Sequence, residues 1–557
     1  MKKIYALLLS FLLLIPWHLP EGNSSYDGNV LYVGGDGEGN YSSISDAVFA
    51  AEDGDTIFVY NGTYEESVYI GKRINLIGES KESVIIVAGI YGYAINVSCD
   101  GVFIKNFSIT GGAALNAGVV IHSCSCILEN CRVYENSWDG ISIKGDGNVI
   151  RGCEIFDNLY GIEISGDENS IENCSIYGNS GAIEMEYADG NIIEKCEIGN
   201  NIYSGISMAK SSHNTIHDCV FHKNGIMITG ESINEFIQDI SNNSIDGKPI
   251  LYFKNEAFME NGTKAGEIIA VGCNDFVIQN AEIEFGIEIA YCNNGMIKNC
   301  RIYGGYYGLL AYHSNRNIVE GNYVHGANES GIELQNCDEN LISSNEIEYA
   351  ANNAIAITES CNNGIYNNKI HDNGMGVLIF SYSNGNNISG NDVYDNQFYG
   401  ISIQGGSYNI IEKNYIYANK EWCGIAIAKS WTKYNVIREN NISENKCGIH
   451  LEGIGNTVER NSIYKNGYGI FLSAWLSKCK RNRIAQNNFI GNENDASFEV
   501  DLLSLNKWQG NYWDSWMAKT PKPIYGYAII EFGRYGFGIR FPWVNFDWHP
   551  ALQPYEI

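Results

Sequence analysis

Hydrophobic residues recur along most of this chain as short alternating groups, not as helical stripes. Residues 140–143 read GISI and residues 161–164 read GIEI. Between residues 118 and 469, units of Gly or Ala, then Ile or Val, any residue, and Ile or Leu begin every 20 to 24 positions, with one interval of 61. Side chains two apart share one face of an extended strand, so each unit predicts a short strand with one buried face.

A fixed period of this length predicts a solenoid in which each repeat makes one turn. A leucine-rich repeat has a similar period, but the Leu framework it needs is absent. We therefore predict an all-β fold, a right-handed single-stranded parallel β-helix. About 17 coils would form one unbroken rod about 80 Å long over residues 56–500. We assign the long interval, residues 225–286, to shortened coils and a side loop near residues 254–266.

Equivalent positions of stacked coils become neighbours, so the repeat predicts columns of like side chains. Stacked Asn side chains would hydrogen-bond to each other, and Cys would fill the same small slot. Paired Cys in register would point in parallel and strain a disulfide, so we predict mostly buried free thiols. The column consists of Cys131, Cys153, Cys174, Cys196, Cys219, Cys300, Asn322, Asn345, Asn368, Asn391, Asn414, Asn440, Asn461 and Asn487.

The first residues have the pattern of an export signal. Two lysines precede an apolar run, Ile4–Ile15, that is too short to span a bilayer comfortably. We predict a signal peptide over residues 1–25, with no membrane span after cleavage. No clear cleavage site is visible, so an uncleaved anchor is the alternative. The mature chain would be secreted, extracellular or held at the cell surface.

Both ends of a β-helix need covers, because open strand edges recruit other chains. Residues 26–55 are predicted to form an N-terminal cap, with an amphipathic helix over 42–54 and Ser43 and Asp46 placed as a capping box. The first strand would follow at TIFV, residues 56–59. Residues 501–557 contain five of the ten Trp and five of the eight Pro, which predicts an aromatic, Pro-rich C-terminal cap.

Charge excludes some partners. The net charge of −29 at pH 7 disfavours nucleic acids and acidic lipid surfaces. It is compatible with a soluble monomer.

Three stretches carry a family resemblance. GGDGEGNYSSISDAVFAAEDGDTIFVYNGTYEESVYIGKRINLIGES, from residue 34, resembles the start of pectate-lyase-like β-helix proteins. The coils, SIDGKPILYFKNE at 244–256 and GNYW at 510–513 resemble archaeal and bacterial NosD-like proteins. The resemblance implies a periplasm-like location, copper binding, and association with carbohydrate-binding and sugar-hydrolase β-helix domains. The catalytic motifs of pectin methylesterases, polygalacturonases and mannuronan epimerases are absent.

One acidic group is a candidate site. Glu163, Glu184 and Glu186 are predicted to point outward, and Glu163 should stack against Glu184 with Lys144 one coil away. Such a group would suit a Ca²⁺ ion or paired carboxylates for sugar hydrolysis. The alternative is a solvated acidic face, because no Arg or His nearby completes a catalytic set.

A possible copper site is the alternating set His122, Cys124 and Cys126, whose soft ligands suit Cu(I) or Zn²⁺. The alternative for the two thiols is burial in the core.

A row of aromatic residues follows the second strand of many coils. Its clearest members are Tyr134, Phe156, Tyr177, Tyr394 and Tyr417. An exposed row would let a linear glycan stack along the rod, whereas a buried one would stabilise neighbouring strands.

The sequence therefore predicts a secreted or surface β-helix protein that binds polysaccharide along its outer face. A polysaccharide lyase or glycoside hydrolase is the first alternative. A NosD-type copper-associated accessory protein is the second.

Overall fold

Short parallel strands, three to each coil, wind through the chain for about 21 turns. This computed structural model describes residues 28–557 except 90–91, 113–115, 430, 475–477, 517 and 533–536. The predicted parallel β-helix is confirmed. The prediction of about 17 coils was low, because several coils lack the Gly-Ile-x-Ile unit.

One coil and its successor show the common plan. Strands of the first coil pair in parallel and in register with those of the second, and each central Ile is buried. Corners between strands place a single residue in the left-handed region, such as Gly152 (φ 62°) or Asn173 (φ 50°), which explains the frequent Gly and Asn there. The strands are β14 (Val149–Arg151), β15 (Glu154–Phe156) and β16 (Tyr160–Ile164), followed by β17 (Ser170–Glu172), β18 (Ser175–Tyr177) and β19 (Gly181–Glu186).

The predicted column of like side chains is confirmed. The Asn391 Nδ2 and backbone N–H both donate to Asn414 Oδ1 at 2.9 Å. Cys153 and Cys174 precede strands paired in register, one strand spacing apart. All sixteen cysteines are free thiols, and thirteen are buried.

Two further columns of asparagine were missed by the sequence reasoning. They occupy the other two corners of each coil and are bonded in the same way. One contains Asn148, Asn169, Asn191 and Asn214, and continues as Asn317, Asn340, Asn363, Asn386, Asn409, Asn435, Asn456 and Asn482. The other contains Asn136, Asn158, Asn179, Asn201 and Asn224, and continues as Asn373, Asn396, Asn419, Asn445, Asn466 and Asn492.

Breaking one column is expected to destabilise the fold. Asn391→Leu keeps the branched shape and the number of heavy atoms but leaves the buried amide of Asn368 without its acceptor and the Ile365 carbonyl without a donor. The free energy of unfolding should fall by about 3 kcal/mol in chemical denaturation. Exposed Asn352→Leu is the control, with an expected change of about 0.5 kcal/mol or less. Equal midpoints for the two variants would show that the column contributes little.

The N-terminal end is covered as predicted, with one difference. Helix α1 (Ile44–Ala50) buries Ile44 and Val48, and the Ser43 side chain accepts a hydrogen bond from the Asp46 backbone N–H at 3.1 Å. The first strand is β1 (Val30–Val33), before this helix, and it pairs with β2 (Thr56–Val59), the strand predicted to be first. The predicted signal peptide lies outside the described residues. None of the helices described from residue 28 onward is long and apolar enough to cross a membrane.

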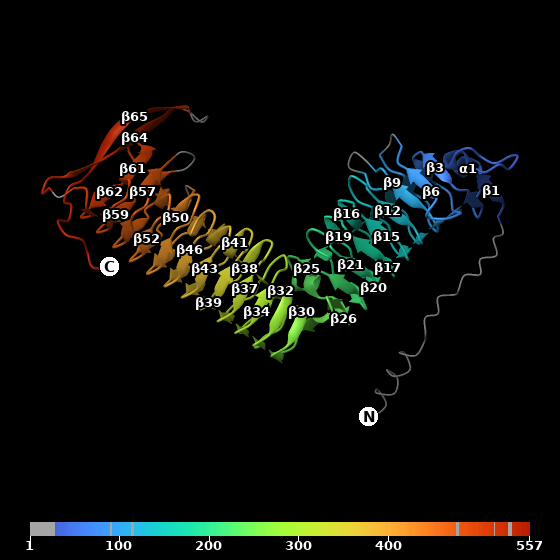
Figure 1. The fold of residues 1–557 in the computed structure, drawn as a ribbon, viewed down its shortest axis with the longest axis horizontal. Helices are drawn as coiled ribbons and strands as arrows, with labels where there is room; N and C mark the ends of the chain where they lie inside the picture. Colours follow the sequence, from blue (N-terminus) through green and yellow to red (C-terminus); the bar gives the residue numbers. More distant parts are fainter. Residues whose placement is uncertain are drawn as a thin grey trace, which may run out of the picture.

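The rod is bent, not straight (Figure 1). Two separate hydrophobic cores fill its two arms. The first arm ends at β25 (Ile226–Thr229), helix α2 (Ile233–Phe236), β26 (Asp239–Ser241) and β27 (Ser244–Ile245). Strand β28 (Lys248–Lys254) pairs antiparallel with β27, so the chain reverses there, and it pairs in parallel with β30 (Lys264–Val271) to begin the second arm. The predicted unbroken rod is therefore wrong. The predicted side loop at 254–266 is replaced in part by strand β29 (Met259–Asn261).

The bend arises because the outer face of the second arm covers the open end of the first. Strands β30, β32 (Glu282–Ala290) and β35 (Leu309–Tyr312) are largely buried on both faces. Ile269, Leu310 and Tyr312 pack into the first core, whereas their neighbours Ile268 and Leu309 pack into the second.

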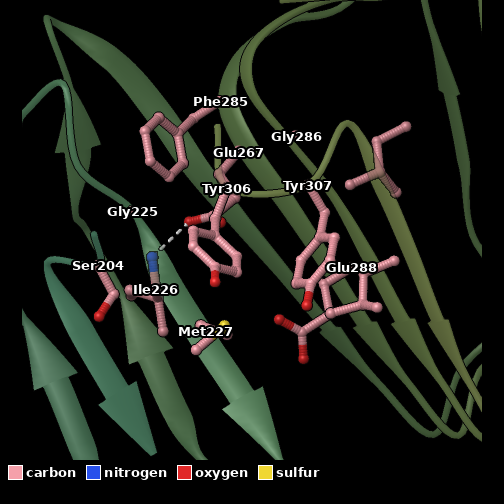
Figure 2. Close-up of a pocket in the computed structure, with 12 residues that line it drawn as sticks. Ser204, Gly225, Ile226, Met227, Glu267, Phe285, Gly286, Glu288, Tyr306 and Tyr307 are labelled. Carbon is pink, nitrogen blue, oxygen red and sulfur yellow. Dashed lines mark hydrogen bonds between the residues drawn. The ribbon is translucent and has the colours of Figure 1, made fainter. Parts of the chain in front are cut away.

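Two buried glutamates complete this joint (Figure 2). Strand β25 is the last strand of its sheet, so its backbone N–H groups have no following strand to bond. Glu267 accepts from the Ile226 N–H at 3.0 Å, and Glu288 accepts from the Ile228 N–H at 3.2 Å. Both side chains line a small cavity of about 30 Å³. The two carboxyl groups thus accept the hydrogen bonds that a further strand of this sheet would otherwise accept.

The C-terminal cap closes the second arm. Strand β61 (Asn494–Asp501) pairs in parallel with β64 (Lys522–Phe532), which forms a long antiparallel hairpin with β65 (Phe537–Asp547). Strands β62 (Lys507–Gln509) and β63 (Tyr512–Trp513) end the other two faces. Buried Asp547 accepts hydrogen bonds from the backbone N–H groups of Gly510 and Asn511.

Candidate functional site

One sheet of the first arm, which contains β16 and β19, presents its outer face on the inner side of the bend (Figure 1). This face is formed by outward side chains of successive strands in register: Asn96, Val120, Ser142, Glu163, Glu184 and Ser207. We call this surface the concave groove. Its deepest part is a cavity of about 330 Å³, lined also by Trp138, Asp139, His122 and Lys144.

A carboxyl pair lies at the centre of this cavity. Asp139 lies in the turn before β13 (Ile141–Ile143) and is only 2% exposed. Burial, together with the charge of Glu163 and a hydrogen bond to it, raises the pKa of Asp139 to about 8, although Lys144 opposes the shift. Ser142 Oγ donates to Glu163 Oε2 at 2.7 Å. Asp139 therefore holds a proton at neutral pH.

Two buried oxygen atoms in the cavity lack partners. Neither Asp139 Oδ1 nor Asn96 Oδ1 has a hydrogen-bond partner among the described residues. Buried polar atoms in folded proteins are nearly always bonded, so such atoms in a cavity are places for water or a ligand. Half-exposed Trp138 adds an aromatic surface beside them.

Of the three predicted acidic residues, two lie beside each other and the third lies apart from them. Glu163 and Glu184 stack in register, and Lys144 lies close to the carboxyl pair. Burial raises the pKa of Glu184, while a hydrogen bond from Ser207 opposes the rise. Glu186 is exposed and lies beside Ala209 on the next strand, away from the cavity. Asp139, which sequence reasoning missed, takes the central place.

The predicted aromatic row forms columns of rings that stack on each other. Phe156 lies between Tyr134 and Tyr177 with centroid distances of 5.1 Å, and Tyr394 stacks on Tyr417 at 5.0 Å. Each inner ring therefore has its faces covered by its neighbours, and mainly ring edges remain for a ligand. The row is also interrupted, for example by Gly199 beside Tyr177.

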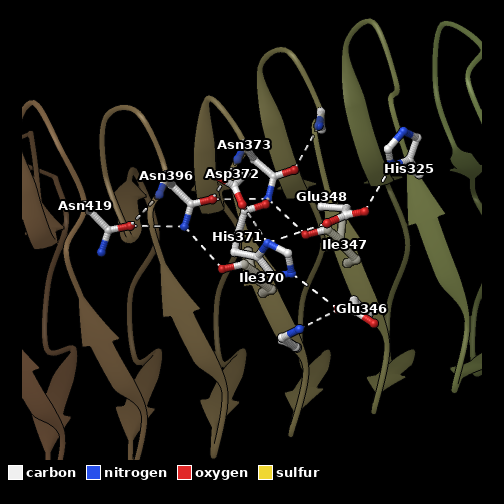
Figure 3. Close-up of polar contacts among 12 residues, drawn as sticks. His325, Glu346, Ile347, Glu348, Ile370, His371, Asp372, Asn373, Asn396 and Asn419 are labelled. Atoms are coloured by element: carbon white, nitrogen blue, oxygen red, sulfur yellow. Dashed lines mark hydrogen bonds and ion pairs between the residues drawn. The ribbon is translucent and has the colours of Figure 1, made fainter.

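A network of histidines and acids borders the second column (Figure 3). His371 stacks on Tyr394 at 4.9 Å and is 7% exposed. Its Nδ1 lies 2.9 Å from an Asp372 oxygen, and its Nε2 lies 3.4 Å from a Glu346 oxygen. Glu348 bonds the ring of His325 at 3.0 Å. Because these side chains hydrogen-bond to each other across coils, the network strengthens the strand faces.

The predicted copper ligands do not converge. His122 lies at the concave groove with its side chain exposed. Partial desolvation of the imidazole ring and the charge of Lys144 lower its pKa. Cys126 is buried, and its thiol donates to the Cys99 carbonyl at 3.4 Å. Cys124 Sγ accepts from the Asp146 N–H. Within the described part of the chain, no group of three or more His, Cys, Asp or Glu side chains is arranged to hold a metal ion.

This architecture is that of a solenoid built from right-handed parallel β-helix repeats. The family model described as "Right handed beta helix region" matches residues 117–263, 251–393, 321–457 and 364–506, well over half of the chain. The chain therefore belongs to the right-handed β-helix family.

Solved structures with similar folds include a periplasmic alginate epimerase, at 15% identity over 62% of this chain and 76% of that one, with a TM-score of 0.34. The pectin methylesterase from Aspergillus niger is 19% identical over 40% of this chain and 87% of its own, with a TM-score of 0.31. Pectate lyase Pel9A is 13% identical over 56% of this chain and 78% of its own, with a TM-score of 0.30. Likenesses at this level carry no argument about activity. A search of curated proteins finds no match.

Proposed function

We propose that the chain binds a polysaccharide in the concave groove. The observation that carries this proposal is the combination of unpartnered Asn96 and Asp139 oxygens with the half-exposed ring of Trp138 in one cavity. Sugar rings offer C–H faces to aromatic rings and hydroxyl groups to carboxylates and amides, so this combination suits a saccharide.

In this proposal the groove recognises one sugar unit, and the rest of the polymer extends along the floor of the sheet. Trp138 packs against a sugar face, while Glu163 and Asn96 accept hydrogen bonds from hydroxyl groups. Lys144 adds a positive charge for an acidic group on the glycan. The mature protein would be secreted or held at the cell surface, which the lysine pair and apolar run at the N-terminus support. It would act as a monomer.

Catalysis is the second candidate, because Asp139 would hold a proton at neutral pH beside an acceptor. Hydrolysis would need a wider spacing between the two carboxyl groups. In glycosidases these groups stand about 5 to 9.5 Å apart, whereas Asp139 and Glu163 are hydrogen-bonded to each other. A lyase is compatible with the closer pair. Binding alone is favoured, because no Arg lines this cavity among the described residues.

The test is calorimetric titration with acidic and neutral polysaccharides. Trp138→Ala is expected to weaken binding about tenfold. Trp431→Ala, which removes an exposed tryptophan of the second arm, should leave it unchanged. Equal affinity in wild type and Trp138→Ala would remove the groove from consideration. Loss of binding in Tyr394→Ala/Tyr417→Ala would instead place the glycan on the aromatic columns. New reducing ends or unsaturated products would identify an enzyme.

A further inference from the structure

Another cavity lies in the C-terminal cap, which stands at the far end of the second arm from the bend (Figure 1). It has a volume of about 550 Å³ and lies between β62 and the final part of β65. Its walls are rich in aromatic rings, from Trp508, Trp543, Phe546 and Trp548. Trp543 is 44% exposed and Trp548 is 63% exposed, so large flat rings border the opening.

One residue of the cavity wall carries an unmatched hydrogen-bond donor. Trp508 is only 5% exposed, and its indole N–H has no acceptor among the described residues. The neighbouring indole of Trp513, in contrast, donates to buried Asp547 at 3.3 Å. An indole N–H can only donate, so a buried one without an acceptor calls for an oxygen supplied by water or a ligand.

The polar part of the wall differs in charge from the rest of the protein. The chain has 65 acidic and 36 basic residues, yet the side chains lining this cavity include Lys507 and His549 and no carboxylate. Asn545 and Gln509 add amide groups. Asp547 is adjacent in sequence, but it is fully buried and its oxygens are occupied by the N–H groups of Gly510, Asn511 and Trp513.

From these observations we propose that the cap cavity is a saccharide-binding site, separate from the concave groove, with a preference for sugars that carry a carboxylate. Trp543 and Trp548 would pack against sugar faces, and the Trp508 N–H would donate to a ring or hydroxyl oxygen. Lys507 would pair with the sugar carboxylate. The inference rests on the proposed function only for the class of ligand, because the cap site requires nothing of the groove.

The residues that line the cap cavity fit a saccharide ligand better than an added polypeptide strand. Strand β62 has three residues and pairs with β65 at one position only, Trp508 opposite Asp547, which offers a very short edge for an added strand. A buried donor beside rings and amides is the arrangement expected for a ligand rich in hydroxyl groups.

The test is calorimetric titration of the full chain with a hexasaccharide of α-1,4-linked galacturonate and with cellohexaose. Wild type is expected to bind galacturonate at two sites per chain. Trp543→Ala/Trp548→Ala should lose one site, and Trp138→Ala should weaken the other about tenfold. Trp508→Phe keeps a ring but removes the donor, and it should weaken the cap site about fivefold to tenfold. Cellohexaose should bind the cap about tenfold more weakly than galacturonate.

The outcomes separate the two proposals. If the groove proposal fails, wild type will show one site that persists in Trp138→Ala and disappears in Trp543→Ala/Trp548→Ala. If the cap variants bind both sugars with wild-type affinity and stoichiometry, or wild type binds neither sugar, the cap proposal is overturned. It is also overturned if sedimentation shows a wild-type dimer that Trp548→Ala converts to monomer, because the rings would then contact a second copy. Exposed Trp431→Ala is the matched control, and thermal melting checks that each variant is folded.

Discussion

The free energy of unfolding is expected to fall by about 5 kcal/mol as the pH rises from about 4.5 to about 8, through the titration of Glu267. Complete burial at the joint raises the pKa of this carboxyl to about 8, against a hydrogen bond from Ile226 that lowers it. Between these pH values the folded chain holds a proton that the unfolded chain releases. Stability therefore declines with pH over that interval and levels off above it.

Glu288 contributes in the same direction. Burial raises its pKa above the usual range, and the charge of Glu267 adds to the rise. One of its oxygens, Oε1, is buried without a partner among the described residues, so ionisation of the pair would place two charges in a cavity of about 30 Å³. We expect the joint between the arms to loosen first at alkaline pH.

Denaturant titrations across this pH interval check the prediction. Glu267→Gln retains an acceptor for the Ile226 N–H but cannot ionise, so its unfolding midpoint should vary much less with pH than that of wild type. Other groups titrate as well, and the difference between the two proteins isolates Glu267. Exposed Glu493→Gln is the control and should keep the wild-type slope. Parallel slopes for Glu267→Gln and wild type would disprove the account of the joint.

Glycan binding in the concave groove is expected to weaken about tenfold for each pH unit above about 8. Below that pH Asp139 is protonated and hydrogen-bonds to Glu163, which leaves its Oδ1 to accept from a sugar hydroxyl, because burial and neighbouring Glu163 raise its pKa to about 8. Above it the two carboxylates are both charged, so they repel each other and any acidic group on the glycan. Affinity follows the fraction of the protonated pair.

Two substitutions separate charge from hydrogen bonding at this position. Asp139→Asn cannot ionise, so binding should be nearly independent of pH between about 7 and 9. Asp139→Ala removes the group and should weaken binding about a hundredfold at neutral pH. Calorimetry with the same oligosaccharides measures both. A pH profile for Asp139→Asn that matches wild type would rule out this carboxyl as the titrating group.

Much of the fold follows from the spacing of residues. The interval of 20 to 24 residues specifies the coil, and small polar residues at its corners specify the columns of Asn and Cys. The bend was not predicted, because the repeat motif stops between Gly225 and Gly286. A signal was present, however: residues 267–271 read EIIAV, a run that lacks alternation and is typical of a strand buried on both faces.

The candidate site was predicted only in part. Glu163 and Glu184 lie on strands, where alternation shows which way a side chain points. Asp139 lies in a turn, and its position over the groove depends on how the turns of neighbouring coils fold back onto the sheet. The aromatic row was found by spacing, but spacing alone could not show that the rings cover each other's faces.

The asparagine columns also bear on how the length of this molecule can change. Within each column, successive coils present the same amides above and below, so adding or deleting one complete coil there would reconnect the column and alter an arm by about 4.8 Å. An insertion of one residue within a strand would exchange its inward and outward side chains. We therefore expect natural variants to differ in length by whole turns, with each arm lengthening or shortening independently of the other.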